Sequence, residues 1–233
     1  MKDLFGRALV DYQNGHYTED IITSTSISDN DILPIPYLFR NYKEMPKIEQ
    51  KALDLAYGDV LDVGCGAGSH SLHLQDKKSL NVKAIDISQG AIEVCFKRGI
   101  KYAQVIDVLE VTDQFDTILL LMNGTGVFQK LDQVTKYLLH LKILLKPKGQ
   151  ILIDSSDIMY MYEDDEGRQS IEDTENYYGE LEYYVAYKGE KEVPFNMLYL
   201  DFELLKKACF AVGLKCVMLT EGEHYDYLAK IYV

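Results

Sequence analysis

The sequence has no hydrophobic run long enough to cross a membrane and no secretory leader at its start. None of its apolar stretches approaches the roughly 18–20 residues that span a bilayer. Residues 1–7 contain no apolar core followed by a small-residue cleavage site. The four cysteines form no CxxC pair and no cluster with histidine, which predicts free thiols and no metal site. We therefore expect a cytoplasmic protein without a membrane partner.

Basic residues are scarce as well. Lys and Arg number 24 against 37 Asp and Glu, for a net charge of −13. Such an acidic surface repels phosphate backbones and anionic lipids, so we expect no nucleic-acid partner. The acids concentrate in residues 157–182, where ten of them accompany a single base, Arg168.

The rest of the composition is that of an ordinary globular protein. Hydrophobic residues make up 47% of the chain and charged residues 26%, which excludes a disordered or low-complexity protein. A length of 233 residues predicts one domain with an elaboration.

Short apolar strands alternate with helical patterns through the middle of the chain. Strands are predicted at residues 60–63, 82–86, 102–106, 115–122 and 149–154, and helices at 68–74, 88–97 and 132–145. Buried strands separated by helices indicate a parallel sheet that is covered on both faces.

The two flanking regions differ from this pattern. Residues 1–58 contain two predicted helices, 3–14 and 46–56, separated by a polar stretch at 23–31, and we interpret them as an N-terminal helical cap. Within the remainder, 59–233, residues 155–200 look like an insertion that ends in a β-hairpin, followed by a helix at 201–212 and strands at 214–219 and 225–233. The predicted fold is a doubly wound α/β fold with this cap and this flap.

The segment from Val60 to Gly68 has the strongest functional signal. It follows a predicted strand and opens a predicted helix, and it carries glycine at 64, 66 and 68. Glycines in that position let the backbone turn tightly and approach a ligand near the helix N-terminus. The spacing is GxGxG rather than the GxGxxG of dinucleotide enzymes, and Asp62 precedes the first glycine. An acid there suits a ligand with an ammonium group and would repel a pyrophosphate.

Acids also end the next two predicted strands. Asp86 can accept two hydrogen bonds from a ribose diol. Asp107 can accept from an exocyclic amine, while Val108 beside it packs on a base. Acids at three successive strand ends describe a nucleoside with a positively charged tail, and S-adenosylmethionine has that shape and charge.

Residues 59–154 resemble the class I S-adenosylmethionine-dependent methyltransferases. The resemblance rests on the glycine segment, on Ala84-Ile85-Asp86-Ile87-Ser88, on Ile106-Asp107-Val108, on the strand from Phe115 to Asn123, and on Leu144-Leu145-Lys146-Pro147-Lys148-Gly149. It implies a Rossmann-like sheet of seven strands, mostly parallel, with strand seven antiparallel.

The resemblance also implies roles for individual residues. Gly64, Cys65, Gly66 and Gly68 would approach the methionine moiety, with Asp62 beside them. Asp86 and Ile87 would hold the ribose, Asp107 and Val108 the adenine, and Met122 and Asn123 would lie near the sulfonium. N-terminal segments of such enzymes often fold over the cofactor, so Arg40 is a candidate to pair with its carboxylate.

The predicted reaction is methyl transfer from S-adenosylmethionine to an oxygen or nitrogen atom of a small molecule. The turn Asn123-Gly124-Thr125-Gly126 differs from the Asn-Pro-Pro-Tyr of many enzymes that methylate base nitrogens. The sequence identifies neither a catalytic base nor an oligomeric state. Two alternatives stay open at this point: a non-catalytic protein that binds S-adenosylmethionine, and an NAD(P)-dependent oxidoreductase, which shares the sheet.

Overall fold

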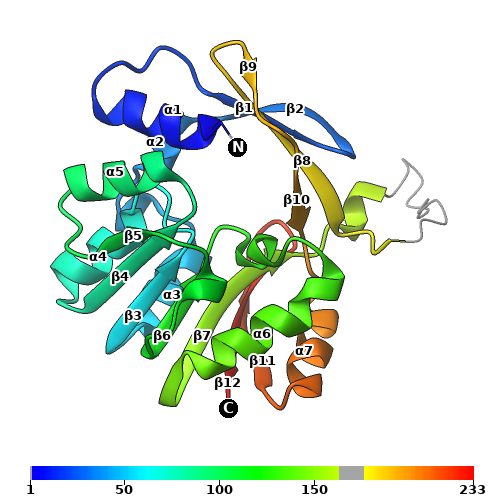
Figure 1. Cartoon of the computed structure of the whole chain (residues 1–233). Helices are drawn as coiled ribbons and strands as arrows, with labels where there is room; N and C mark the ends of the chain where they lie inside the picture. Colours follow the sequence, from blue (N-terminus) through cyan, green and yellow to red (C-terminus); the bar gives the residue numbers. More distant parts are fainter. Residues whose placement is uncertain (1, 163–175) are drawn as a thin grey trace.

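A seven-stranded sheet forms the centre of the protein (Figure 1). The computed structural model describes residues 2–162 and 176–233. The strands lie in the order β11-β12-β7-β6-β3-β4-β5. Their bounds are β3 Asp59–Val63, β4 Asn81–Asp86, β5 Ala103–Val105, β6 Phe115–Leu120, β7 Leu145–Ser156, β11 Lys215–Glu221 and β12 Asp226–Tyr232.

Strands β3 to β7 are parallel, and β12 runs antiparallel to both β7 and β11. The predicted doubly wound α/β fold is therefore confirmed, including its antiparallel strand. Because parallel strands end at the same edge, the residues after β3, β4, β5 and β6 meet there.

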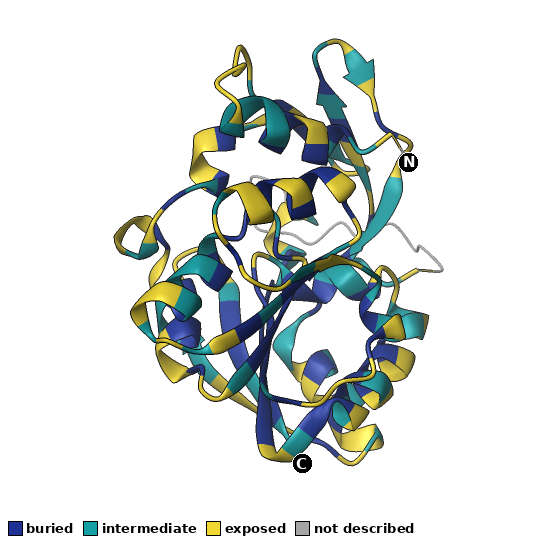
Figure 2. Cartoon of the chain, turned by 60° about the vertical axis from the view of Figure 1, so that its left-hand side comes forward, coloured by how far each residue is buried: buried dark blue, intermediate teal, exposed yellow. Residues whose placement is uncertain are grey.

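Helices cover both faces of this sheet. Their bounds are α3 Lys47–Leu55, α4 Ser69–Lys77, α5 Gln89–Lys97, α6 Val134–Ile143 and α7 Phe202–Ala211. Helices α6 and α7 pack on one face, and α3 and α4 pack on the other through Leu53 and Leu74. Figure 2 shows the strands as buried and the outer helix faces as exposed, as expected for a sheet between two helical layers.

A second sheet lies above the carboxyl-terminal edge of the first (Figure 1). Its order is β10-β8-β1-β2, with β9 paired to β8. The bounds are β1 Ile21–Thr25, β2 Ser28–Leu33, β8 Glu180–Tyr187, β9 Glu190–Lys191 and β10 Phe195–Leu198. Helices α1 (Leu4–Gln13) and α2 (Ile35–Leu38) pack against it through Leu4, Ile35 and Tyr187.

The second sheet corrects one part of the sequence interpretation. Both predicted helices of the N-terminal cap are present, but the polar stretch at 23–31 contributes to strands. Its partner is β8, and Ile22 pairs with Ala186. The partner strand is remote in the sequence and β2 is mostly exposed. The sequence around β1 and β2 therefore has no hydrophobic pattern that predicts these two strands. The predicted hairpin in 155–200 is present as β8, β9 and β10.

Close contacts at glycines help to attach the second sheet and α1 to the rest of the protein. A Cβ atom at Gly126 would lie 2.2 Å from Sδ of Met197, so β10 passes directly over the turn after β6. A Cβ atom at Gly90 would lie 2.5 Å from the carbonyl carbon of Gly6, so α1 and α5 meet at two glycines. Of the ten acids in 157–182, the seven at 163–166, 172, 173 and 175 lie outside the described residues.

Candidate cofactor-binding site

The glycine loop joins β3 to α4 and faces open space. Gly64, Gly66 and Gly68 have φ angles of 70°, 52° and 79°, which favour glycine. A Cβ atom at Gly64 or Gly66 would meet nothing within 4 Å, whereas at Gly68 it would lie 2.2 Å from Cδ1 of Ile100. The first two glycines therefore leave room for a ligand, and the third lets the loop pack on the protein.

Asp86 ends β4 and holds this loop. Its Oδ2 accepts a hydrogen bond of 2.9 Å from the backbone N of Gly66, and its Oδ1 accepts one of 2.9 Å from the backbone N of Ser88. Burial raises the pKa of Asp86. Ile87 follows with 61% of its surface exposed, so an apolar side chain stands uncovered beside the predicted ribose site.

Asp107 and Val108 differ in their surroundings. Oδ1 of Asp107 accepts a hydrogen bond of 2.8 Å from the backbone N of Leu109 and caps the short helix η2 (Val108–Glu110). The Val108 side chain is 3% exposed and belongs to the core under α6. Asp107 thus lies where the sequence places it, while Val108 presents little side-chain surface to a ligand.

The turn after β6 has an uncommon conformation. Met122 and Asn123 both lie in the left-handed region, with φ angles of 67° and 60°. That conformation costs a non-glycine residue roughly 1–2 kcal/mol, although Asn tolerates it better than most. Asp154, at the end of β7, accepts hydrogen bonds from the backbone N atoms of Met122 (2.9 Å) and Gly124 (2.8 Å). Sequence reasoning missed Asp154, although an acid after the apolar run 151–153 was a usable signal.

Polar side chains connect this turn to β7 and β10. The hydroxyl of Thr125 lies 2.6 Å from that of Ser155 and donates to the carbonyl oxygen of Leu198 at 3.0 Å. Nδ2 of Asn123 donates to the same carbonyl at 3.3 Å. The turn at the predicted sulfonium position is thereby tied to the second sheet.

Arg40 is buried in an ion-pair network. Its Nη2 lies 2.6 Å from Oε2 of Glu49 on α3, and Nε2 of His70 on α4 lies 2.7 Å from the same oxygen. Burial opposes ionisation, but the hydrogen bond to His70 and the Arg40 charge lower the pKa of Glu49. Nε of Arg40 is buried and has no hydrogen-bond partner among the described residues. Arg40 therefore retains one unused donor, and its pairing with the cofactor carboxylate stays a prediction.

The sequence did not point to Glu49 and His70. His70 is 8% exposed and paired with an acid. The available signal was Glu49 itself, because it shares a helix face with Ala52 and Leu53, which are fully buried.

Two further predicted residues point into the protein. Asp62 is 1% exposed and accepts a hydrogen bond of 2.6 Å from the hydroxyl of Ser71, while burial raises its pKa. Sγ of Cys65 lies 3.6 Å from Sγ of Cys95 beneath the loop. Cys65 can thus offer a ligand its backbone, and the role of Asp62 toward an ammonium group stays a prediction.

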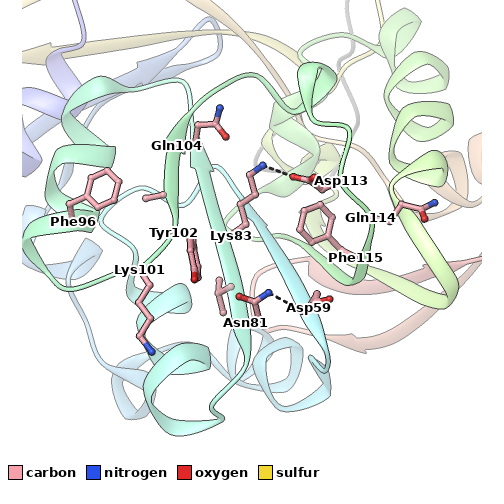
Figure 3. Close-up of a pocket in the computed structure, with 12 residues that line it drawn as sticks. Asp59, Asn81, Lys83, Phe96, Lys101, Tyr102, Gln104, Asp113, Gln114 and Phe115 are labelled. Carbon is pink, nitrogen blue, oxygen red and sulfur yellow. Dashed lines mark hydrogen bonds and ion pairs between the residues drawn. The ribbon is translucent and has the colours of Figure 1, made fainter.

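A pocket of about 620 Å³ lies elsewhere, at the opposite ends of the strands (Figure 3). Asp59, Asn81 and Phe115, at the starts of β3, β4 and β6, line it. It also contains the ion pair of Lys83 with Asp113, at 2.7 Å. None of the predicted site residues lines this pocket. Among the described residues, no group of His, Cys, Asp or Glu side chains could hold a metal ion.

Comparisons with known proteins identify the family. A family model described as "Methyltransferase domain" matches residues 57–196. The structure of a SAM-dependent methyltransferase from Bacteroides fragilis, solved with S-adenosyl-L-homocysteine, is 40% identical with a TM-score of 0.93. The similarity covers 100% of this chain and 95% of that one. The chain belongs to the S-adenosylmethionine-dependent methyltransferases.

More distant methyltransferases share the fold of this methyltransferase. CcbJ from Streptomyces caelestis is 13% identical, with a TM-score of 0.62 over 81% of this chain and 97% of that one. A methyltransferase from Clostridium acetobutylicum is 16% identical, with a TM-score of 0.57 over 83% and 92%. No curated protein matches the chain. Methyl transfer with S-adenosylmethionine is thus confirmed as the reaction, in place of the oxidoreductase and the non-catalytic binder.

The residues of this methyltransferase fit that cofactor. The space above Gly64 and Gly66, which a Cβ atom would enter unopposed, can receive a methionine moiety. The free Nε donor of Arg40 suits a carboxylate.

No helix of the described segments is long and apolar enough to span a bilayer.

Proposed function

We propose that this methyltransferase acts on a small neutral or cationic molecule, which binds between the second sheet and the ends of β6 and β7. The observation that carries the proposal is the contact of β10 with the turn after β6. Met197 lies against Gly126 there, and Asn123 donates to the Leu198 carbonyl. An acceptor that reaches the cofactor beside Met122 and Asn123 would therefore meet the second sheet.

The face of the second sheet that continues from Met197 is apolar and includes two aromatic rings, which also pack on the cluster under α1 and α2. Tyr183 pairs with Phe195 and Leu181 with Met197, so alternating residues share one face. The rings of Tyr183 and Phe195 lie 5.4 Å apart. Aromatic faces attract cations and pack on neutral rings, and they offer nothing to a phosphate.

The charges near this face support the same acceptor class. Burial raises the pKa of Tyr183, a hydrogen bond with Thr23 lowers it by less, and the Asp31 carboxylate raises it further. Asp157, just beyond β7, accepts a hydrogen bond of 2.8 Å from the Tyr178 hydroxyl. Carboxylates on this side of the site would attract amines and oppose anionic acceptors, including nucleic acids.

The chain's own residues would hold the cofactor and the acceptor in line. We propose that Asp86 binds the ribose, Asp107 the adenine amine and Arg40 the carboxylate of S-adenosylmethionine, with Ile87 packing nearby. The cofactor supplies an activated methyl group, so alignment of the acceptor atom can provide most of the rate enhancement. Deprotonation of an ammonium acceptor would need a base, which we do not assign.

We further propose that, of the cap region 1–58, the part that carries α1, α2, β1 and β2 acts together with residues 155–200 as a lid, while α3 belongs to the core with the rest of 59–233. Support comes from the pairing of β1 with β8, which joins both regions in one sheet.

The direct test measures release of S-adenosylhomocysteine across a panel of acceptors. The panel pairs amines and neutral alcohols with matched carboxylates and phosphates of similar size. We expect turnover with members of the first group only. A polyanion as the best acceptor would contradict the proposal and leave the family assignment intact.

A further inference from the structure

One carboxylate controls the turn that the cofactor must approach. Both oxygens of Asp154 are engaged, Oδ2 by the backbone N of Met122 and Oδ1 by that of Gly124. Within the turn that these two hydrogen bonds hold, Met122 and Asn123 both have a left-handed backbone conformation. Residues forced into such conformations persist only where their surroundings fix them. Here the backbone N–H groups of Met122 and Gly124 are both held by one side chain from the neighbouring strand, while the side chains of Asn123 and Thr125 bind β7 and β10.

Asp154 is buried near two other ionisable groups. The residue is 7% exposed, and burial raises its pKa to about 6 despite the two backbone hydrogen bonds. The charged groups that influence it are Glu49 from α3, which opposes ionisation, and His70 from α4, which favours it. Tyr227 on β12 lies within electrostatic range as well. Asp154 can therefore change its protonation state close to neutral pH.

We propose that Asp154 is a positioning residue for methyl transfer: its carboxylate holds the Met122–Gly124 turn in the conformation that binds the cofactor, and protonation releases the turn. In a protonated carboxyl one oxygen carries the proton and is a much weaker acceptor, so one of the two N–H groups loses most of its hydrogen bond. The inference concerns cofactor binding and does not depend on which acceptor is methylated.

The first test uses the wild-type protein without cofactor. Amide resonances of Met122 and Gly124 are followed by NMR from pH 4.5 to 8. Both are expected to shift together, with one midpoint near the pKa of Asp154. The Asp59 amide, which donates to Asp116 at the other end of the sheet, should not shift in this range because the pKa of Asp116 is lowered, first by that hydrogen bond. Independent behaviour of the two amides, or no shift, would overturn the proposal.

The second test compares variants by calorimetry with S-adenosylmethionine. Wild-type affinity is expected to fall about tenfold one pH unit below the midpoint. Asp154→Asn should bind more weakly at pH 7.5 and show no such decline, because an amide has only one accepting oxygen. Asp116→Asn likewise turns a carboxyl group that accepts from a backbone N–H into an amide, but it lies beside Lys146 at the opposite end of the sheet, so the variant should keep the wild-type pH profile. The proposal fails if Asp154→Asn keeps that profile; if it does not fold, the NMR titration decides.

Discussion

Acids at or near the strand ends accept hydrogen bonds from backbone N–H groups. Asp86 holds Gly66 and Ser88, Asp107 caps its own short helix, and Asp154 holds the turn after β6. Replacing any of them should change the shape of a loop in addition to removing the ligand contact that we propose for Asp86 and Asp107. Measured effects will combine the two.

Asp86→Ala should therefore weaken S-adenosylmethionine binding by about 1.5–3 kcal/mol, the range for hydrogen bonds to a charged group. Calorimetry at pH 7.5 measures the change. Asp113→Ala is the matched control, because Asp113 pairs with Lys83 in the pocket at the opposite end of the strands. Unchanged affinity in a folded Asp86→Ala protein would remove Asp86 from the ribose site.

Gly66→Ala and Gly68→Ala form a second test, since both add one methyl group at positive φ. At Gly66 the methyl group enters open space, so cofactor affinity should fall more than tenfold while stability changes by about 1 kcal/mol. At Gly68 it meets Ile100, so overpacking should lower stability by about 1–3 kcal/mol more. Thermal melts and calorimetry on both variants separate the effects. Equal losses of affinity and stability at the two positions would contradict an open cofactor space.

Stability should also depend on pH through Asp154. Its pKa rises from 3.8 to about 6 on folding, so folding favours the protonated form. Its stabilising contribution is present below pH 4 and is lost as pH rises through 6, a change on the order of 2–3 kcal/mol. Denaturant unfolding without cofactor should show Asp154→Asn gaining stability relative to wild type between pH 4 and 7. A constant difference across that range would mean that the carboxyl group is not buried as described.

At the scale of elements, the glycine-rich contact between α1 and α5 attaches the N-terminal region. Gly90→Ala would press a methyl group against the Gly6 backbone. Helix propensity alone would make the Ala variant more stable by about 1 kcal/mol, whereas the contact with Gly6 would make it less stable. The sign of the measured stability change therefore shows which effect is larger. We expect net destabilisation in thermal melts and faster hydrogen exchange in α1 than in α6. Greater stability of the variant would show that the two helices can part without loss.

The parallel strands and their helices were predictable because each carries its own local signal. Neighbours within about five residues in the sequence are enough to recognise the apolar runs, the glycine loop and the acids at 86 and 107. Strands β1 and β2, the Arg40–Glu49–His70 network and the Asp154 contacts were not. Each depends on partners that only the folded chain brings together, and the polar residues involved have no periodic pattern of their own.

At the scale of the whole molecule, charge is the feature most open to experiment. The net charge of −13 is concentrated in 157–182, and Asp164, Asp165 and Glu166 lie outside the described residues. Neutralising these three together should raise KM for a cationic acceptor at low salt, because exposed charges act over roughly 8–10 Å. Cofactor affinity should not change. Steady-state kinetics at several salt concentrations measure the effect, and a KM that is unaltered at all of them would exclude charge steering.

The pairing of β1 with β8 also has a consequence for biosynthesis. Ile22 leaves the ribosome long before Ala186, its partner in the second sheet. Two strands alone are marginally stable in water, so the β1–β2 hairpin would not be stably folded while the central strands are synthesised. Chains generally fold from the N-terminus as they emerge, but the second sheet can form only once β8 and β10 have been translated. In a nascent chain the glycine loop would therefore be made before the second sheet is complete. The loop would be accessible to the cofactor before the second sheet could enclose an acceptor.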